Sequence, residues 1–238
     1  MASRKEQKEQ LRREREEREA LAKAAARRRR LIGYGAGGAF VAVVVVVLVV
    51  LLAGGGGGGG SDGGADVLPS DGEAPAQKIT DLDEAAKAAG CELKSFKAGS
   101  REHTRDLAEA ISYESNPATS GKHFEEPEQD GAFSEAPDAK KLVHALEHGR
   151  VVIWFKKTLP KDERAGLKAL FDEDSYQLIL TPNETRMTYA VAATAWNGDP
   201  QPNGTGRLLG CPRFVPQVFD ALRTFKDEHR SNGPEPVP

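Results

Sequence analysis

The sequence predicts an α+β fold, with a small mixed or antiparallel sheet and packed helices, preceded by a single transmembrane helix and a charged cytoplasmic helix. Three observations predict it. Residues 31–53 contain no charged side chain and exceed the roughly 20 apolar residues that span a bilayer. Residues 1–30 are rich in Lys, Arg and Glu. Residues 78–230 alternate between helix-like and strand-like apolar patterns, which indicates helices packed on a sheet.

Residues 1–30 carry twelve Lys or Arg and six Asp or Glu side chains. Pairs such as Glu9 with Arg13 have the favourable i, i+4 spacing of a solvated helix. Four arginines at 27–30 directly precede the apolar segment, where they favour contact with anionic lipid headgroups. We therefore expect membrane lipid as a partner and no nucleic acid.

Residues 31–53 are interpreted as a helix because a single segment in lipid satisfies its backbone only in that form. Residues 54–238 hold 21 basic and 30 acidic side chains, so the basic N-terminus is expected in the cytoplasm and the rest outside the cell membrane. The alternative, a cleaved signal peptide, has a shorter apolar region of about 7–15 residues. Gly33 and Gly37 have the G-x-x-x-G spacing through which such helices form homodimers.

Residues 54–77 are interpreted as a flexible linker, because they begin with seven consecutive glycines and offer too few apolar side chains for a core. Residues 78–230 are long enough for one extracytoplasmic α+β domain. Residues 231–238 form a tail with three prolines.

The first half of this domain contains few periodic segments. A helix is expected over residues 82–89, ended by Gly90, followed by a strand over 92–96. Residues 99–137 are rich in Gly, Pro, Ser and Glu, and we interpret them as a loop with a short extended piece at 111–113. A loop of that length in a compact domain is usually either disordered or functional.

The second half is more regular. The apolar spacing predicts helices and strands in alternation, separated by a turn at Pro182 and Asn183 and by a loop over residues 197–210. The expected helices are 138–148, 159–174 and 215–229, and the expected strands are 151–155, 176–181 and 189–196.

Cys91 and Cys211 are the two cysteines of the chain, and both follow the apolar segment. An oxidising compartment outside the membrane would allow them to pair. The expected disulfide joins the start of the domain to its last helical region; two free buried thiols are the alternative.

Four strings resemble a bacterial membrane-anchored family catalogued as domain of unknown function 3105. They are SNPATSGKHF, LVHALEHGRVVIWF, YAVAATAW and CPRF, in this order after one apolar segment. The resemblance covers about residues 91–229, although Ala118 and Lys122 depart from the family's usual NPPTSGPH. It implies a location and a fold, and it implies no established activity.

Five residues are candidates for a transition-metal site that binds copper or zinc. His144 and His148 lie at i, i+4, on the side of their helix opposite its apolar residues, where one ion can meet both rings. His123, in a glycine-containing loop, is a third candidate ligand. The thioether of Met187 would favour copper, whereas Glu147 or water would favour zinc.

Two other functions remain open. In the first, the histidines lie on an exposed helix face, Glu147 is solvated and Met187 fills the core of a structural or partner-docking module. In the second, the string His144 to His148 matches the H-x-x-E-H motif of zinc hydrolases, with Glu147 as general base. Because the P-loop, G-x-G-x-x-G and G-x-S-x-G motifs are absent, the sequence favours a binding protein over an enzyme.

Overall fold

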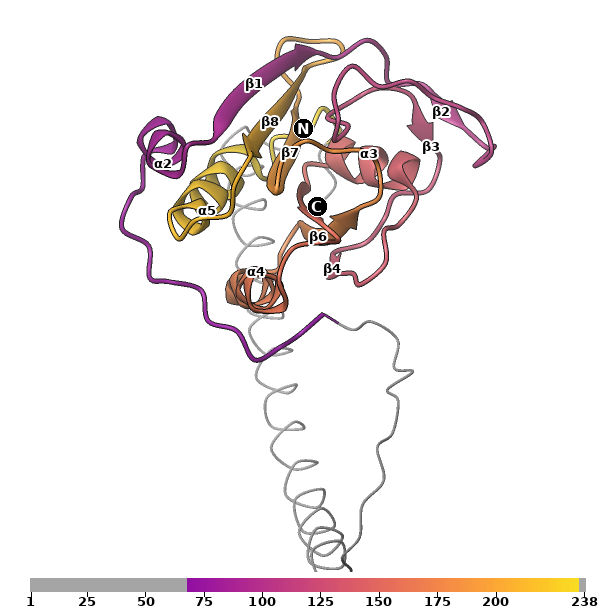
Figure 1. Cartoon of the computed structure of the whole chain (residues 1–238). Coiled ribbons are helices and arrows are strands. Elements are labelled where there is room, and N and C mark those ends of the chain that lie inside the picture. The colour runs from indigo at the N-terminus through magenta and orange to yellow at the C-terminus, as the bar shows by residue number, and fades with distance from the viewer. Residues whose placement is uncertain (1–67, 236–238) are drawn as a thin grey trace, which may run out of the picture. The chain divides into compact units, whose positions relative to one another are not determined.

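The computed structural model describes residues 68–235. Within this range the chain forms four helices and eight strands (Figure 1). The helices are α2 (Leu82–Ala89), α3 (Ala139–Glu147), α4 (Lys161–Glu173) and α5 (Val218–His229). The strands are β1 (Glu92–Lys97), β2 (His103–Thr104), β3 (His123–Phe124), β4 (Gly131–Ala132), β5 (Val151–Lys156), β6 (Leu178–Asn183), β7 (Val191–Asn197) and β8 (Thr205–Cys211).

Six strands form one mixed sheet in the order β1-β8-β7-β5-β6-β4. Strands β4, β6 and β5 run parallel to one another, whereas β5, β7, β8 and β1 pair antiparallel. Strands β2 and β3 form a separate parallel pair. The predicted α+β class is confirmed, and the sheet is mixed.

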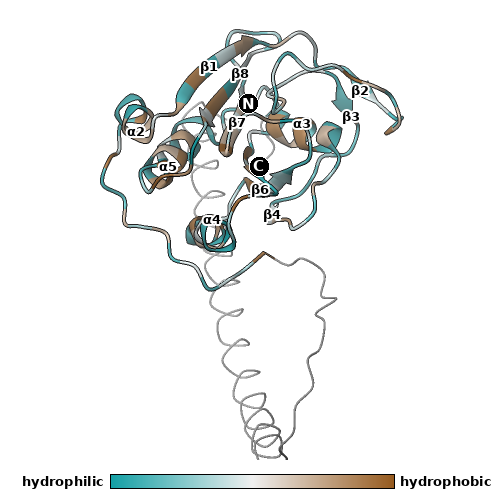
Figure 2. Cartoon of the chain, viewed as in Figure 1, coloured by the Kyte–Doolittle hydropathy of each residue, from teal (hydrophilic) through white to brown (hydrophobic). Residues whose placement is uncertain are grey.

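Both faces of the sheet are covered, because alternate side chains of the central strand β5 enter different cores. Val151 and Ile153 pack with helices α2, α4 and α5 on one face. Val152 and Trp154 pack with α3 on the other face. Figure 2 shows that apolar residues are concentrated where the helices meet the sheet. Helix α3 is therefore held between the sheet and the segment that contains β2 and β3.

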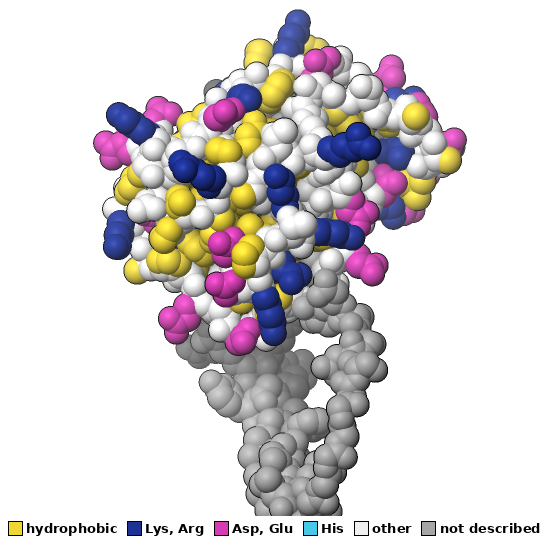
Figure 3. Space-filling model, viewed as in Figure 1, with side chains coloured by type: hydrophobic (Ala, Val, Ile, Leu, Met, Phe, Trp, Pro, Cys, Tyr) yellow, Lys and Arg dark blue, Asp and Glu magenta, His cyan; other side chains and the backbone are white. Residues whose placement is uncertain are grey.

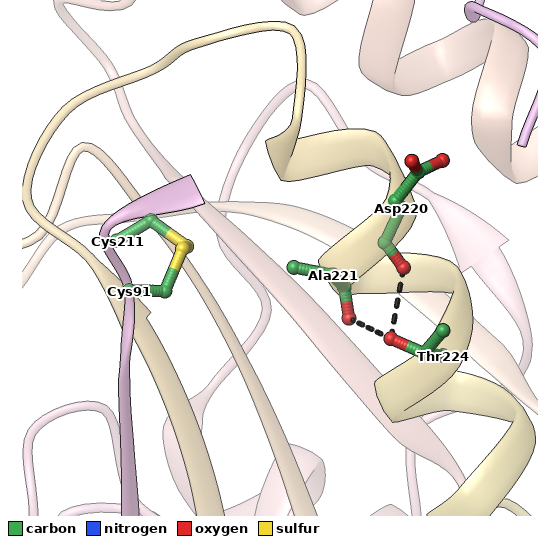
Figure 4. Close-up of a disulfide and its surroundings, with 5 residues drawn as sticks. All are labelled: Cys91, Cys211, Asp220, Ala221 and Thr224. Atoms are coloured by element: carbon green, nitrogen blue, oxygen red, sulfur yellow. Dashed lines mark hydrogen bonds between the residues drawn. A yellow bond between two sulfur atoms is a disulfide. The ribbon is translucent and has the colours of Figure 1, made fainter. Parts of the chain in front are cut away.

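A disulfide between Cys91 and Cys211 is present, as expected (Figure 4). Cys91 precedes β1 and Cys211 is the last residue of β8, so the bond ties the edge strand β1 to its neighbour. Cys211 ends strand β8 directly before the segment that leads into α5 (Val218–His229), the last helix of the described residues.

Three sequence-based assignments are corrected by the structure. The expected loop 197–210 contains most of β8, a strand interrupted by two glycines that carry no strand signal of their own. Pro182 and Asn183 end β6 instead of forming a turn. The expected loop 99–137 contains the three short strands β2, β3 and β4, whereas residues 111–113 form no strand.

The packed domain extends beyond the expected bounds of 78–230. Leu68, assigned to the linker, is buried in the core, and Gly72 lies directly against α4 at Ala165. Residues 231–235, assigned to the tail, bond to the loop that follows α3. Positive and negative side chains are interspersed over the surface seen in Figure 3.

No helix within residues 68–235 is long and apolar enough to cross a membrane. The predicted transmembrane helix, the charged helix before it and the Gly33–Gly37 pair lie outside the described residues.

Candidate metal centre

Helix α3 supplies two of the candidate ligands. The helix begins at Asp138, whose carboxylate accepts a hydrogen bond from the backbone N–H of Lys140. Its apolar residues belong to the core on the α3 face of the sheet; they are Leu142, Val143, Ala145 and Leu146. Strand β3 lies against the helix (Figure 1), and its residues Phe124 and His123 contact His144 and Glu147 respectively.

The pairing of β2 with β3 supplies the other two candidates. The parallel register places His103 beside His123, with ring centroids 4.5 Å apart. The ring of His144 lies 4.7 Å from that of His123 and 4.9 Å from that of His103. Three imidazoles from distant parts of the chain therefore meet above α3.

These three histidines and Glu147 form a group that we call the His3Glu group. One ligand atom from each residue lies within 4.8 Å of the corresponding atom of every other. Oε2 of Glu147 is 3.0 Å from Nε2 of His123 and 3.8 Å from Nε2 of His103. A tetrahedral ion with bonds of about 2.0–2.1 Å separates its ligand atoms by about 3.3 Å, so small movements would bring the group to that geometry.

Hydrogen bonds to backbone carbonyls determine which ring nitrogens are free. Nδ1 of His123 lies 2.7 Å from the carbonyl of Gly121, and Nδ1 of His144 lies 2.7 Å from the carbonyl of Phe124. A carbonyl only accepts, so Nδ1 carries the hydrogen in both rings. Each neutral ring then has a lone pair on Nε2, the arrangement found in metal-binding histidines whose second nitrogen donates to the protein.

Nε2 of His123 and Oε2 of Glu147 are fully buried and lack hydrogen-bond partners among the described residues. They are 3.0 Å apart, but their geometry is not that of a hydrogen bond. Two lone pairs facing each other in a buried site repel unless a cation lies between them. A proton or a metal ion can meet this requirement.

The protonation states suit a metal ion. Burial is the main cause that lowers the pKa of His144 to about 4, so the His144 ring is neutral at pH 7. Burial alone would raise the pKa of Glu147, but the His123 ring, when it carries a second proton in the metal-free chain, and the guanidinium of Arg101 outweigh burial and lower this pKa to about 2. The site therefore offers an ionised carboxylate and a neutral imidazole.

The structure brings together three of the five residues predicted from the sequence: His123, His144 and Glu147. His148 stacks beside His144 with ring centroids 4.6 Å apart, but its Nδ1 bonds to the carbonyl of Glu235 and it lies outside the His3Glu group. Met187 is buried in the core below α3 and is also outside the group.

His103 was missed because it lies in a segment interpreted as loop, and two-residue strands have no periodic signal. The sequence did hold one indication, since the expected loop contains two of the five histidines of the chain. The interpretation with exposed histidines and a solvated glutamate is wrong, since His144 is 5% exposed and Glu147 is 0% exposed.

The geometry also bears on the H-x-x-E-H motif. In that motif both histidines bind the metal and the glutamate stays free as a base. Here Glu147 directs one oxygen at His123 and the other at Arg101, while His148 bonds to the C-terminal segment. Glu147 thus has the position of a ligand, and the roles that hydrolysis needs are not reproduced.

No curated protein and no solved structure matches this chain. Residues 104–236 match the family described as "Protein of unknown function (DUF3105)", and this range holds three of the four residues of the His3Glu group. The match covers more than half of the chain, which therefore belongs to that family.

Proposed function

We propose that this protein binds a transition-metal ion at the His3Glu group, in a domain anchored to the outer side of the cell membrane. The observation that carries the proposal is the pair of buried, unpartnered acceptors, Nε2 of His123 and Oε2 of Glu147, 3.0 Å apart. A divalent ion between these two atoms would remove the repulsion of their lone pairs and would form a coordination bond with each.

Zinc fits the group better than copper. Imidazoles and a carboxylate suit Zn²⁺, whereas the thioether that would favour copper belongs to Met187, outside the group. Three nitrogens and one oxygen also complete the four positions of a tetrahedral zinc site.

The exposure of the ligands supports a site that exchanges its ion with the surroundings. His123, His144 and Glu147 are buried, whereas the side chain of His103 is 43% exposed. Strand β2, which carries His103, pairs with β3 and is not part of the main sheet. An ion can therefore enter and leave on the His103 side without disturbing the core.

The anchoring part of the proposal rests on the sequence and on the disulfide. The uncharged segment 31–53 with its basic flank predicts a span whose following domain lies outside. The bond between Cys91 and Cys211 supports an oxidising compartment for that domain.

Elemental analysis of the purified full-length chain tests the proposal. We expect one zinc ion per chain, and at least about a hundredfold weaker binding in Glu147→Gln, since losing an outer-shell partner alone costs about 10–100-fold. The matched control is His229→Gln, because His229 is a buried histidine on α5, outside the group. A chain that binds no ion, or a Glu147→Gln variant that binds as tightly as the wild type, would contradict the proposal.

A further inference from the structure

We infer that Arg101 is a positioning residue, which restricts Glu147 to a single coordinating oxygen and so selects a four-coordinate cation. The inference rests on the proposed function, because it concerns which ion the His3Glu group prefers.

The two oxygens of Glu147 have different partners. Oε1 lies 2.5 Å from Nε of Arg101, a charge-assisted hydrogen bond. Oε2 faces His123 at 3.0 Å and His103 at 3.8 Å. An ion that binds both oxygens of Glu147 would compete with Arg101 for the electrons of Oε1.

Arg101 is itself fixed by the C-terminal segment, residues 231–235. Its Nη2 lies 3.0 Å from Oε2 of Glu235, so one guanidinium joins two carboxylates. The backbone N–H of Glu235 donates to the carbonyl of Glu147 at 3.1 Å, and the carbonyl of Glu235 accepts from His148 at 2.9 Å. Glu235 therefore contacts both α3 and Arg101. The guanidinium of Arg101 is fixed through two of its nitrogens, Nε on Glu147 and Nη2 on Glu235.

This arrangement discriminates between ions by coordination number. Zn²⁺ and Co²⁺ accept four ligands in a tetrahedron, which the three imidazoles and one oxygen supply. Mn²⁺ prefers octahedral, oxygen-rich surroundings, to which the second oxygen of Glu147 would contribute a protein ligand. The hydrogen bond from Arg101 holds that oxygen and makes it a weaker ligand, so the site should prefer Zn²⁺ and Co²⁺ over Mn²⁺.

The test uses Co²⁺ as a spectroscopic probe in the full-length chain, because tetrahedral Co²⁺ absorbs visible light far more strongly than five- or six-coordinate Co²⁺. We expect strong bands in the wild type. In Arg101→Gln we expect one bound Co²⁺ with weaker bands, and a preference for Zn²⁺ over Mn²⁺ that falls at least about tenfold. Arg101→Lys should change in the same direction, because one ammonium lacks the fork that spans Glu147 and Glu235.

The matched control is Arg105→Gln. Arg105 lies in the same segment, is 88% exposed, pairs with Glu125 at 2.7 Å and is not a member of the His3Glu group, so this variant should match the wild type. Unchanged bands and preference in both Arg101 variants would overturn the inference. Wild-type behaviour in Arg101→Lys would overturn it too, since charge alone would then suffice.

Three further outcomes are decisive. If circular dichroism shows that Arg101→Gln does not fold, Glu235→Ala takes its place, with weaker bands expected and unchanged bands overturning the inference. A wild type that binds one Co²⁺ with weak, six-coordinate bands overturns the inference and leaves the proposed function intact. A wild type that binds neither Co²⁺ nor Zn²⁺ overturns both.

Discussion

At the scale of single residues, the centre depends on a proton at Nδ1 of His123 and of His144. The Nδ1 of His123 donates to the carbonyl of Gly121, just before β3, and the Nδ1 of His144 donates to the carbonyl of Phe124 in β3. Both rings thereby keep Nε2 free as a possible ligand, so the backbone of β3 and of the residue pair before it orients two of the histidines. His123 also packs edge-on against Trp196 of β7, with ring centroids 5.9 Å apart, which joins the site to the sheet.

The burial of two histidines, His144 and His229, predicts that the stability of the metal-free chain depends on pH. Burial lowers the pKa of His144 and of His229 to about 4, compared with about 6.5 in the unfolded chain. Below pH 6.5 the unfolded state therefore binds protons that the folded state does not, and the free energy of unfolding falls. From pH 7 to pH 5 we expect a loss of roughly 2 kcal/mol per histidine.

Urea unfolding of the chelator-treated full-length chain at pH 7 and pH 5 measures this loss. The His229→Gln variant should show about half of the change that these two histidines cause, because the contribution of His144 remains. Equal stability at the two pH values, or greater stability at pH 5, would refute the assignment. Glu147 acts in the same direction at lower pH, since its lowered pKa, about 2, makes acidification below pH 4.5 destabilising.

At the scale of elements, the disulfide holds β1 at the edge of the sheet. Strand β1 pairs with β8, and its residues are mostly exposed, so burial contributes little to keeping it in place. The bond between Cys91 and Cys211 has a sequence separation of 120 residues, for which the chain-entropy model gives about 4–5 kcal/mol as an upper estimate.

Reduction of this disulfide should therefore lower the thermal midpoint by up to about 8–20 °C, since 1 kcal/mol corresponds to about 2–4 °C in a domain of this size. Differential scanning calorimetry with and without reductant measures the shift. Thiol titration in denaturant should find two thiols per chain only after reduction. Two reactive thiols in the unreduced chain would contradict the account.

The contact between the C-terminal segment and α3 depends on the glycine at position 233. A Cβ at Gly233 would lie 2.2 Å from the carbonyl oxygen of Glu147 and 2.3 Å from the backbone nitrogen of Gly149. Gly233→Ala should therefore displace the segment that holds Arg101 and destabilise the fold by about 1–3 kcal/mol.

Denaturant unfolding tests the Gly233→Ala variant against Gly99→Ala. A Cβ at Gly99 has no neighbour within 4 Å, so that variant should unfold like the wild type. If Gly233→Ala were as stable as Gly99→Ala, the segment would not be packed as the structure places it.

Elements with strong local signals were predictable from the sequence. Two elements lie within one or two residues of their predicted bounds. One is helix α2, which is capped by Asp81 and Gly90, and the other is strand β5, which has a continuous apolar run. Strand β8 was not predictable, because Gly206 and Gly210 interrupt it and its stability comes from β1 and β7 on either side. The sheet, and not the local sequence, makes β8 a strand.

Only those site residues that lie in a segment with a strong local signal were predictable from the sequence. The i, i+4 spacing on α3 identified His144, and Glu147 came from the same helical string. His103 joins them only through the β2–β3 pairing, a contact between residues 20 apart that local patterns do not encode. The side of α3 that carries His144 and Glu147 was expected to face solvent, because the sequence does not reveal that β3 covers it.

At the scale of the whole molecule, the account predicts a fixed orientation in the membrane. The basic residues 1–30 should remain in the cytoplasm, and the domain that carries the His3Glu group should lie outside. Protease added to intact cells stripped of their wall should degrade the domain and spare the N-terminal segment. Degradation of the N-terminal segment alone would show the opposite orientation.

The most direct test of the central claim is X-ray absorption at the zinc edge of the purified, zinc-loaded full-length chain. The account predicts four nitrogen or oxygen neighbours at about 2.0–2.1 Å, with the outer-shell scattering of three imidazoles, and no sulfur at about 2.3 Å. A sulfur neighbour, a first shell that lacks imidazoles, or a spectrum of hydrated zinc would contradict a centre formed by His103, His123, His144 and Glu147.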